Sequence, residues 1–202
     1  SDRVVAIFFK VISFFSRVIF KFSILPLVLL MFLCLQIKEH AAGAIRNVSM
    51  NQELEGDITR GGALAPLIDL MDHTNPKIQI QAAVSVRNLS ITPDSKVTVV
   101  EQEALPVLCK LIKSGDLRLV EQAAIIFRHL SRNAENKIKI MATEGAKALV
   151  ELLKPLTKAD ESLDADSKAL KVKIQEQTAG VLRNLSMHND NKVTPLVLYF
   201  CL

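Results

Sequence analysis

The stretch LVEQAAIIFRHLS, residues 119–131, has the helical periodicity that decides the architecture of this chain. Leu119, Ala123, Ile126 and Leu130 fall on one stripe of an α-helix. Related phrases begin at residues 37, 78 and 174: IKEHAAGAIRNVS, IQIQAAVSVRNLS and IQEQTAGVLRNLS. The first two steps are 41 residues long, and the last is 55, one period plus a 14-residue insertion. The chain is therefore an array of repeats.

Two further patterns recur between these phrases. One predicts a helix of medium length: GGALAPLIDLM from residue 61, QEALPVLCKLI from residue 102 and EGAKALVELLK from residue 144. The other is shorter and more polar, as in DSKVTVVE (residues 94–101) and ENKIKIMATE (residues 135–144). Asn75-Pro76, Ser114-Gly115-Asp116 and Gly61-Gly62 separate the helices. Each unit is thus a short, a medium and a longer helix, whose apolar faces are buried only when units stack.

The string EQAA…LRNLS…NK…GALPxLxxLL, with its length of about forty residues, resembles the armadillo repeat family. The resemblance covers roughly residues 37–193. It implies an all-α fold, an armadillo-type right-handed superhelical solenoid of three-helix repeats. HEAT repeats are the nearest rival, but the RNLS phrase argues against them.

We divide the chain into an apolar N-terminal segment, residues 1–36, and repeats in residues 37–202. The repeats are expected at about 37–77, 78–118, 119–173 and, in part, 174–202. Within the third repeat, PLTKADESLDADSKALK (residues 155–171) has few bulky apolar residues and mixed charges. It predicts a flexible loop between the medium and long helices.

Residues 1–36 have three interpretations. Basic residues followed by the apolar run SILPLVLLMFLCL resemble a signal anchor, but the charge-free run of about sixteen residues is short of the ~20 needed to span a bilayer. ILPLVLLMFLC alternatively forms a degenerate medium helix. We favour the third interpretation, in which residues 1–36 and 194–202 are spurious or degenerate ends of a fragment or a faulty gene model.

The formal net charge of +4 is concentrated at the N-terminus, because residues 1–37 carry four basic residues and one acidic residue. The repeats are therefore close to neutral overall, and no nucleic-acid partner is expected. Cys34, Cys109 and Cys201 are far apart in apolar runs, which predicts buried free thiols in a reducing compartment. The expected location is the cytoplasm or the nucleus, and membrane association depends on residues 1–36.

The sequence contains no motif for catalysis. His40, His73, His129 and His188 are scattered over different units, without an HExxH or CxxC motif. No GxGxxG or GxxxxGK[ST] loop occurs. We therefore predict that the protein is not an enzyme and has no catalytic residue, metal site or cofactor. The N-x-[ST] motifs at Asn47, Asn88 and Asn184 are not expected to be glycosylated, because each lies in a helix with a buried neighbour.

Aligning the four phrases places Asn47, Asn88, His129 and Asn184 in one slot, each after an arginine. In a solenoid, equivalent positions form a row along the inner surface. Such a row can hydrogen-bond the backbone of an extended peptide, at about 0.5–1.5 kcal/mol for each bond. Alternatively, the same residues brace the helix ends within the array.

The family resemblance implies that this slot lines a peptide-binding groove, together with Arg46, Arg87, Arg128 and Arg183. Lys96, Lys137 and Lys192, eight residues after the slot, are similar to lysines that hold acidic partner residues in β-catenin-like proteins, or they simply begin the next helix. The first unit departs from the pattern with Glu55. Importin-α-like members have a Trp four residues before the slot, where this chain has Gly43, Val84, Ile125 and Gly180. Recognition of basic import signals is therefore not expected.

These features together predict a non-catalytic protein–protein interaction scaffold. It would bind an extended, acidic-amphipathic segment of a partner protein along the groove of the third helices. The alternative is a membrane-anchored armadillo adaptor that uses the apolar N-terminus.

Overall fold

The computed structural model of the chain describes residues 35–154 and 162–187, and every regular element in these ranges is a helix. The elements are α3 (Leu35–Val48), the 3-10 helix η1 (Gln52–Leu54), α4 (Glu55–Arg60), α5 (Leu64–Met71), α6 (Pro76–Asn88), α7 (Pro93–Glu101), α8 (Ala104–Ile112), α9 (Leu117–Leu130), α10 (Ala134–Met141), α11 (Glu144–Leu152) and α12 (Ala165–Ser186). The predicted succession of a short, a medium and a long helix is seen in α4–α6, α7–α9 and α10–α12. The predicted all-α fold is confirmed.

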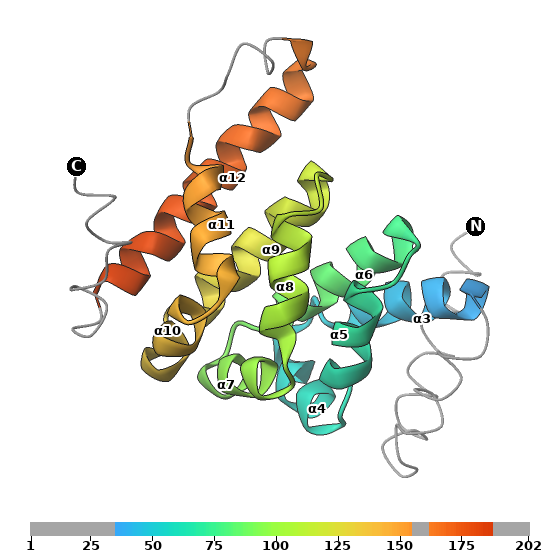
Figure 1. Cartoon of the computed structure of the whole chain (residues 1–202). Helices are drawn as coiled ribbons and strands as arrows, with labels where there is room; N and C mark the ends of the chain where they lie inside the picture. Colours follow the sequence, from blue (N-terminus) through green and yellow to red (C-terminus); the bar gives the residue numbers. More distant parts are fainter. Residues whose placement is uncertain (1–34, 155–161, 188–202) are drawn as a thin grey trace.

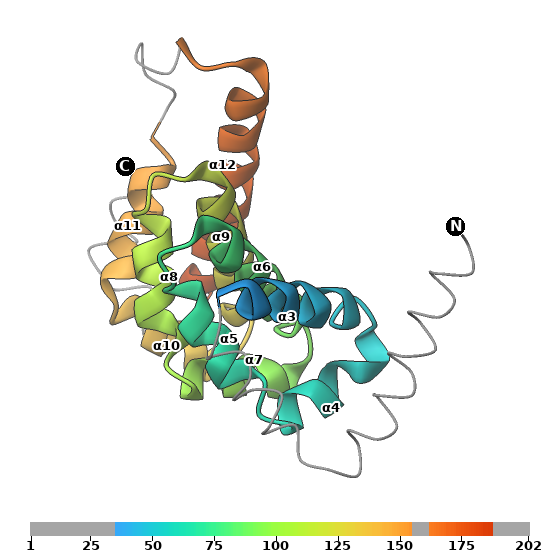
Figure 2. The same ribbon diagram turned by 90° about the vertical axis from the view of Figure 1, so that its right-hand side faces the viewer.

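The helices stack in three layers (Figures 1 and 2). The long helices α3, α6, α9 and α12 pack side by side in chain order. The medium helices α5, α8 and α11 form a second layer, which faces the viewer in Figure 1 and lies to the left in Figure 2. The short helices α4, α7 and α10 line the lower edge of both views. Equivalent positions of successive units therefore form rows across the array.

The predicted helix breakers lie between helices. The Asn75 side chain caps α6 by accepting a hydrogen bond from the backbone N–H of Lys77 at 2.9 Å, and Pro76 follows in the first turn. Gly62 and Gly115 have φ angles of 77° and 78°. A residue with a side chain is strained in this left-handed backbone conformation, so glycine is suited to both turns.

The stripe predicted from LVEQAAIIFRHLS is buried in the core. Leu119, Ala123, Ile126 and Leu130 are each at most 3% exposed. The small residues of the long helices are fully buried as well: Ala82, Ala83, Ala123 and Ala124. Their size allows neighbouring helices to approach closely, so the units share one continuous core.

The loop predicted at residues 155–171 is wrong over its last seven residues, which are helical. Helix α12 begins at Ala165 and is 22 residues long, and its first half projects beyond α9 and α11 (Figure 1). The Asp164 carboxylate caps it by accepting a hydrogen bond from the N–H of Ser167 at 2.6 Å. The low apolar content that suggested a loop is equally suited to an exposed helix, and the Ala, Lys and Leu of this stretch favour helix.

The predictions for residues 1–34, 194–202, Lys192, Cys34 and Cys201 lie outside the described residues. Helix α3 begins at Leu35, two residues before the predicted start of the array. In the part of the chain that the structure describes, no helix is long and apolar enough to cross a bilayer. Cys109 is a free thiol, but it is only half-buried, at the edge of the contact between α8 and α11, so the prediction of full burial is wrong.

Candidate functional site

The slot residues and the arginines before them lie on the long helices, on a face of that layer which we call the long-helix face. The slot residues Asn47, Asn88, His129 and Asn184 lie in the last turn of α3, α6, α9 and α12, and they are half-buried or exposed. The structure therefore brings the four slots into one row, which we call the slot row.

Each arginine of the phrase is tied to the next long helix. Nη1 of Arg46, Arg87 and Arg128 donates to the side-chain oxygen of Gln81, Gln122 and Gln177, at 3.0, 2.7 and 2.8 Å respectively. Arg183, on the last described helix, is exposed. The side-chain oxygen of a glutamine accepts a hydrogen bond but carries no charge, so it orients the guanidinium without neutralising it. We call these four arginines the arginine row.

The slot row is tied to the preceding long helix. Nδ2 of Asn88 donates to Oγ of Ser49 at 3.1 Å, and Nδ2 of Asn184 donates to Oγ of Ser131 at 3.0 Å. His129 takes the equivalent place, with Nδ1 at 2.9 Å from Oγ of Ser90. The interpretation of the slot as internal bracing thus has direct support.

The serines determine which kind of side chain fits the slot. The hydroxyl groups of Ser49, Ser90 and Ser131 donate to the backbone carbonyls of the arginines three residues earlier, at 2.8, 2.7 and 3.0 Å. Each serine oxygen must therefore accept from the slot residue. Asn does this through its amide, and neutral His129 does it when Nδ1 carries the proton. This shared donor role explains why an imidazole replaces Asn in the third unit.

The bracing leaves hydrogen-bonding capacity for a partner. An Asn amide has two N–H groups, and Asn88 uses one on Ser49. Nδ2 of Asn184 contacts both Oγ of Ser131 and, at 3.5 Å, the carbonyl of Arg128. His129 is half-buried, so part of its imidazole is accessible to solvent while Nδ1 contacts Ser90. Internal bracing and partner recognition are therefore compatible at the slot row.

The residues eight positions after the slot differ sharply between units. Lys96 and Lys137 are half-buried. Glu55, in the same place in the first unit, is 1% exposed, and its Oε1 accepts hydrogen bonds from the N–H groups of Ile91 at 3.2 Å and Thr92 at 3.0 Å. Glu55 therefore braces the next repeat, whereas Lys96 puts cationic charge close to His129 on the long-helix face.

The electrostatic field around His129 is positive. Burial lowers the pKa of His129 from its ordinary value of 6.5 to about 4, and the nearby cations Arg132, Lys96 and Arg87 contribute, against a hydrogen bond with the Arg87 backbone. Burial also lowers the pKa of Lys96, with a further contribution from Arg132 that Glu55 opposes. His129 is consequently neutral at pH 7, in a setting that favours a bound anion.

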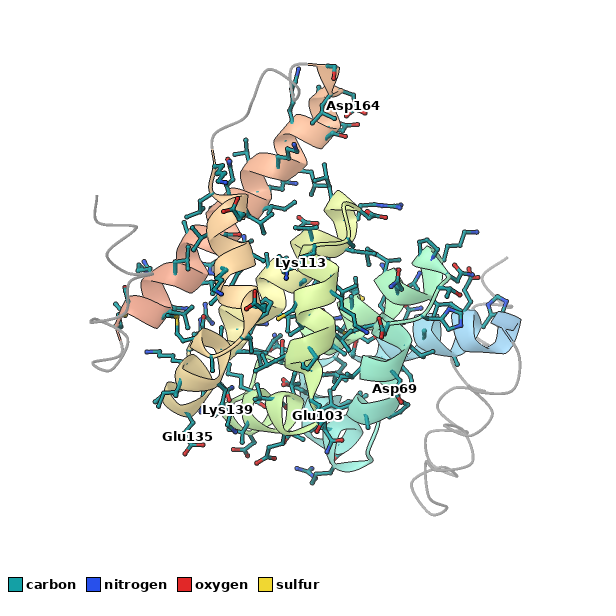
Figure 3. All side chains as sticks on the ribbon, viewed as in Figure 1. Asp69, Glu103, Lys113, Glu135, Lys139 and Asp164 are labelled. Carbon is teal, nitrogen blue, oxygen red and sulfur yellow. The ribbon has the colours of Figure 1, made fainter. Side chains whose placement is uncertain are left out.

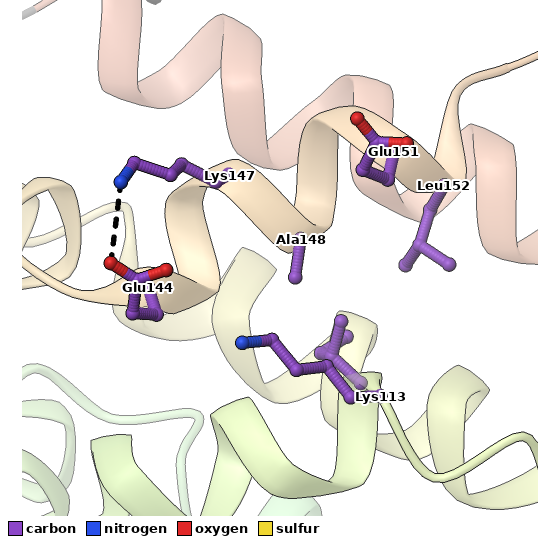
Figure 4. A pocket seen from close by; sticks show the side chains of 7 residues that line it. Lys113, Glu144, Lys147, Ala148, Glu151 and Leu152 are labelled. Carbon is purple, nitrogen blue, oxygen red and sulfur yellow. Dashed lines mark hydrogen bonds and ion pairs between the residues drawn. The ribbon is translucent and has the colours of Figure 1, made fainter.

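The opposite faces carry charges of both signs. Figure 3 labels Asp69 and Lys113 on the medium-helix layer, and Glu135 and Lys139 on α10. An open cleft of about 330 Å³ lies between α8 and α11, with Lys113, Lys147 and Glu144 among its lining residues (Figure 4). Glu144 and Lys147 form an exposed ion pair there. Among the described residues, no three His, Cys, Asp or Glu side chains are grouped as metal ligands.

Sequence reasoning missed the glutamines and serines that hold the two rows. Gln81, Gln122 and Gln177 precede the small-residue pair of each phrase, and a serine closes each phrase two residues after the slot. Their recurrence at the repeat period was the available signal. Which residues they contact depends on how neighbouring helices are placed, and the phrase alone does not contain that information.

Two segments, residues 60–91 and 92–132, match the family model described as Armadillo/beta-catenin-like repeat. No curated protein matches the sequence. Several solved structures are similar in fold. A designed armadillo repeat protein in complex with the peptide (KR)4 is 20% identical, with a TM-score of 0.69 over 83% of this chain and 66% of that one.

A second designed armadillo repeat protein is 17% identical, with a TM-score of 0.71 over 86% of this chain and 68% of that one. ARO, the armadillo repeats only protein from Plasmodium falciparum, is 20% identical, with a TM-score of 0.64 over 81% of this chain and 66% of that one. The chain thus spans about two thirds of the length of these proteins, and what it shares with them is the fold.

Proposed function

We propose that this chain is an armadillo-repeat protein, and that it acts as a non-catalytic scaffold that binds an extended, acidic segment of a partner protein along the long-helix face. The slot row supplies hydrogen bonds to the partner's backbone, and the arginine row with Lys96 and Lys137 attracts its carboxylates. Each contact is weak, so binding requires several repeats in register.

The observation that carries this proposal is the uncompensated charge of the arginine row. Among the described residues, no ion pair involves any of its members or the two lysines. Glu121 lies close enough to Arg87 to oppose the lowering of its pKa by burial, but it forms no ion pair with it. Guanidinium groups held at a regular spacing by neutral glutamines favour a polyanionic ligand.

The sign of the charge distinguishes this face from that of a fold relative. The designed protein in complex with (KR)4 has a basic peptide as its ligand. A basic peptide would meet like charges on the arginine row here. We therefore expect the opposite preference, for a peptide of Asp and Glu.

The test is a binding titration of the full 202-residue chain with two labelled octapeptides, one of alternating Asp and Glu and the other (KR)4. Fluorescence anisotropy should show binding of the acidic peptide only. The affinity of that peptide should decrease as the salt concentration is raised from about 50 to about 300 mM, because salt screens the attraction between the charges. Equal or stronger binding of (KR)4 would contradict the proposal.

Two charge reversals make a matched pair. Lys96→Glu places a carboxylate on the long-helix face, and Lys113→Glu makes the same change on the medium-helix layer. We expect Lys96→Glu to lower the affinity for the acidic peptide about tenfold, or by about 1.4 kcal/mol. Lys113→Glu should change this affinity by less than about twofold. Circular dichroism of both variants must match the wild type, and equal losses would place the binding surface elsewhere.

A further inference from the structure

A row of exposed residues follows the slot row by three positions, and we call it the rim row. Its members are Met50, Ile91, Arg132 and Met187. Met50 is 70% exposed, Ile91 40% and Met187 65%, and Arg132 is exposed as well. Scattered exposed apolar residues need no explanation, but three of them at the same position within four successive units form a repeated surface.

The rim row continues the long-helix face. In each unit, the rim residue lies one to three residues beyond the last residue of the long helix, in the connection that follows it. Arg132 is near enough to His129 and Lys96 to lower the pKa of both. A segment lying on the slot row therefore passes close to Arg132.

Charge distinguishes one position of the rim row from its neighbour. Ile91 is apolar, and the Glu55 carboxylate that accepts a hydrogen bond from its N–H is buried. Arg132, one repeat further on, is an exposed cation and lies near Lys96. A partner carboxylate is therefore attracted at the second position and finds no exposed cation in the side chain at the first.

We propose that the rim row selects a partner segment in which one acidic side chain pairs with Arg132 and Lys96, while apolar side chains cover Met50, Ile91 and Met187. This inference rests on the proposed function, because it describes the segment bound to the same face. Adjacent packed helices are about 8–10 Å apart, and an extended chain advances about 3.3 Å per residue. The selected residues are therefore spaced by about three positions: apolar, apolar, acidic, apolar, in either chain direction.

The experiment uses the full chain and three peptides with the same acidic flanks. The first has three Leu and one Glu in the proposed order, each separated by two Ser. The second has the same composition, with Glu moved to one end of the three Leu. The third replaces Glu in the first peptide by Gln.

The first peptide should bind about tenfold more tightly than the second. Ile91→Ser should weaken the first peptide about tenfold, whereas Ile138→Ser, which removes a similarly exposed isoleucine (48%) from α10, should leave binding within twofold. A double-mutant cycle of binding affinities combines Arg132→Gln with the peptide in which Gln replaces Glu. The coupling between the two changes should be roughly fivefold in affinity, the upper range for an exposed ion pair.

The outcomes separate this inference from the proposed function. If all three peptides bind equally well, and Ile91→Ser binds like the wild type, the rim row is not selective, although the acidic scaffold stands. If no acidic peptide binds the folded chain, both proposals are overturned. Weakening of the first peptide by Ile138→Ser as much as by Ile91→Ser would also overturn the rim row.

Discussion

His129 donates a hydrogen bond from Nδ1 to the hydroxyl oxygen of Ser90, at 2.9 Å, across the boundary between two repeats. The direction follows from the Ser90 hydroxyl, which already donates to the carbonyl of Arg87 at 2.7 Å. Asn88 and Asn184 donate to serines of their preceding repeats in the same way. His129 is thus a variant of a repeated inter-repeat contact.

The donor role of His129 can be tested by substitution. His129→Asn should keep the free energy of unfolding within about 0.5 kcal/mol, because it restores the donor of the other units. His129→Leu should lower it by about 1 kcal/mol, because Oγ of the fully buried Ser90 loses a donor. Urea unfolding of both variants measures the difference. Equal stability of the two would show that this hydrogen bond contributes nothing.

Stability should depend on pH through His129. Its folded pKa of about 4 lies below the ordinary 6.5, so the unfolded chain binds more protons between these values. The contribution of the neutral imidazole is therefore complete above pH 6.5 and is lost as the pH falls toward 4. NMR titration of the imidazole gives the pKa directly.

A matched comparison isolates this pH effect. The unfolding free energies of the wild type and His129→Asn, measured between pH 4 and 7.5, should diverge as the pH falls, with the wild type losing more. Parallel curves would assign the acid sensitivity to other groups.

The arginine row should stabilise the array more than exposed ion pairs do. Arg87 donates to Gln122, which is 7% exposed, whereas both members of the Lys147–Glu144 pair are about 70% exposed. A double-mutant cycle for Arg87→Met and Gln122→Met should give a coupling of about 1.5–3 kcal/mol, as for hydrogen bonds to charged groups. The cycle for Lys147 and Glu144 should give about 0–1 kcal/mol. Similar couplings would show that the arginine row adds no special stability.

The contact between α8 and α11 depends on a glycine. A Cβ at Gly145 would lie 2.6 Å from Sγ of Cys109 and 3.1 Å from the fully buried Phe127 ring. Gly145→Ala should therefore lower the free energy of unfolding by about 1–3 kcal/mol. Gly43→Ala is the control, since a Cβ there meets nothing within 4 Å, and it should raise stability by about 0.5–1 kcal/mol. Thermal unfolding measures both variants, and a shift of the midpoint temperature in the same direction for Gly145→Ala and Gly43→Ala would contradict the prediction.

Several expectations stay predictions from the sequence. The cytoplasmic or nuclear location, the membrane-anchored alternative and the role of Lys192 concern residues or properties that the described helices do not test.

The repeat architecture follows from the order of the amino acids alone, because the period of 41 residues and the 3.6-residue apolar stripe are both properties of local sequence. It also placed the slot residues in one row, since equivalent positions of a stacked array must align. It did not separate an exposed helix from a loop at Ala165–Lys171, because composition alone is the same for both.

The contacts of the slot row and the arginine row depend on how the helices pack in three dimensions. Arg87 and Gln122 are 35 residues apart, and Asn88 and Ser49 are 39 apart, so these hydrogen bonds depend on the distance and rotation between packed helices. The same packing buries Glu55 and leaves Lys96 half-exposed at equivalent positions. The repeat pattern determines which residues are equivalent, while helix packing determines which of them are used within the array and which remain available to a partner.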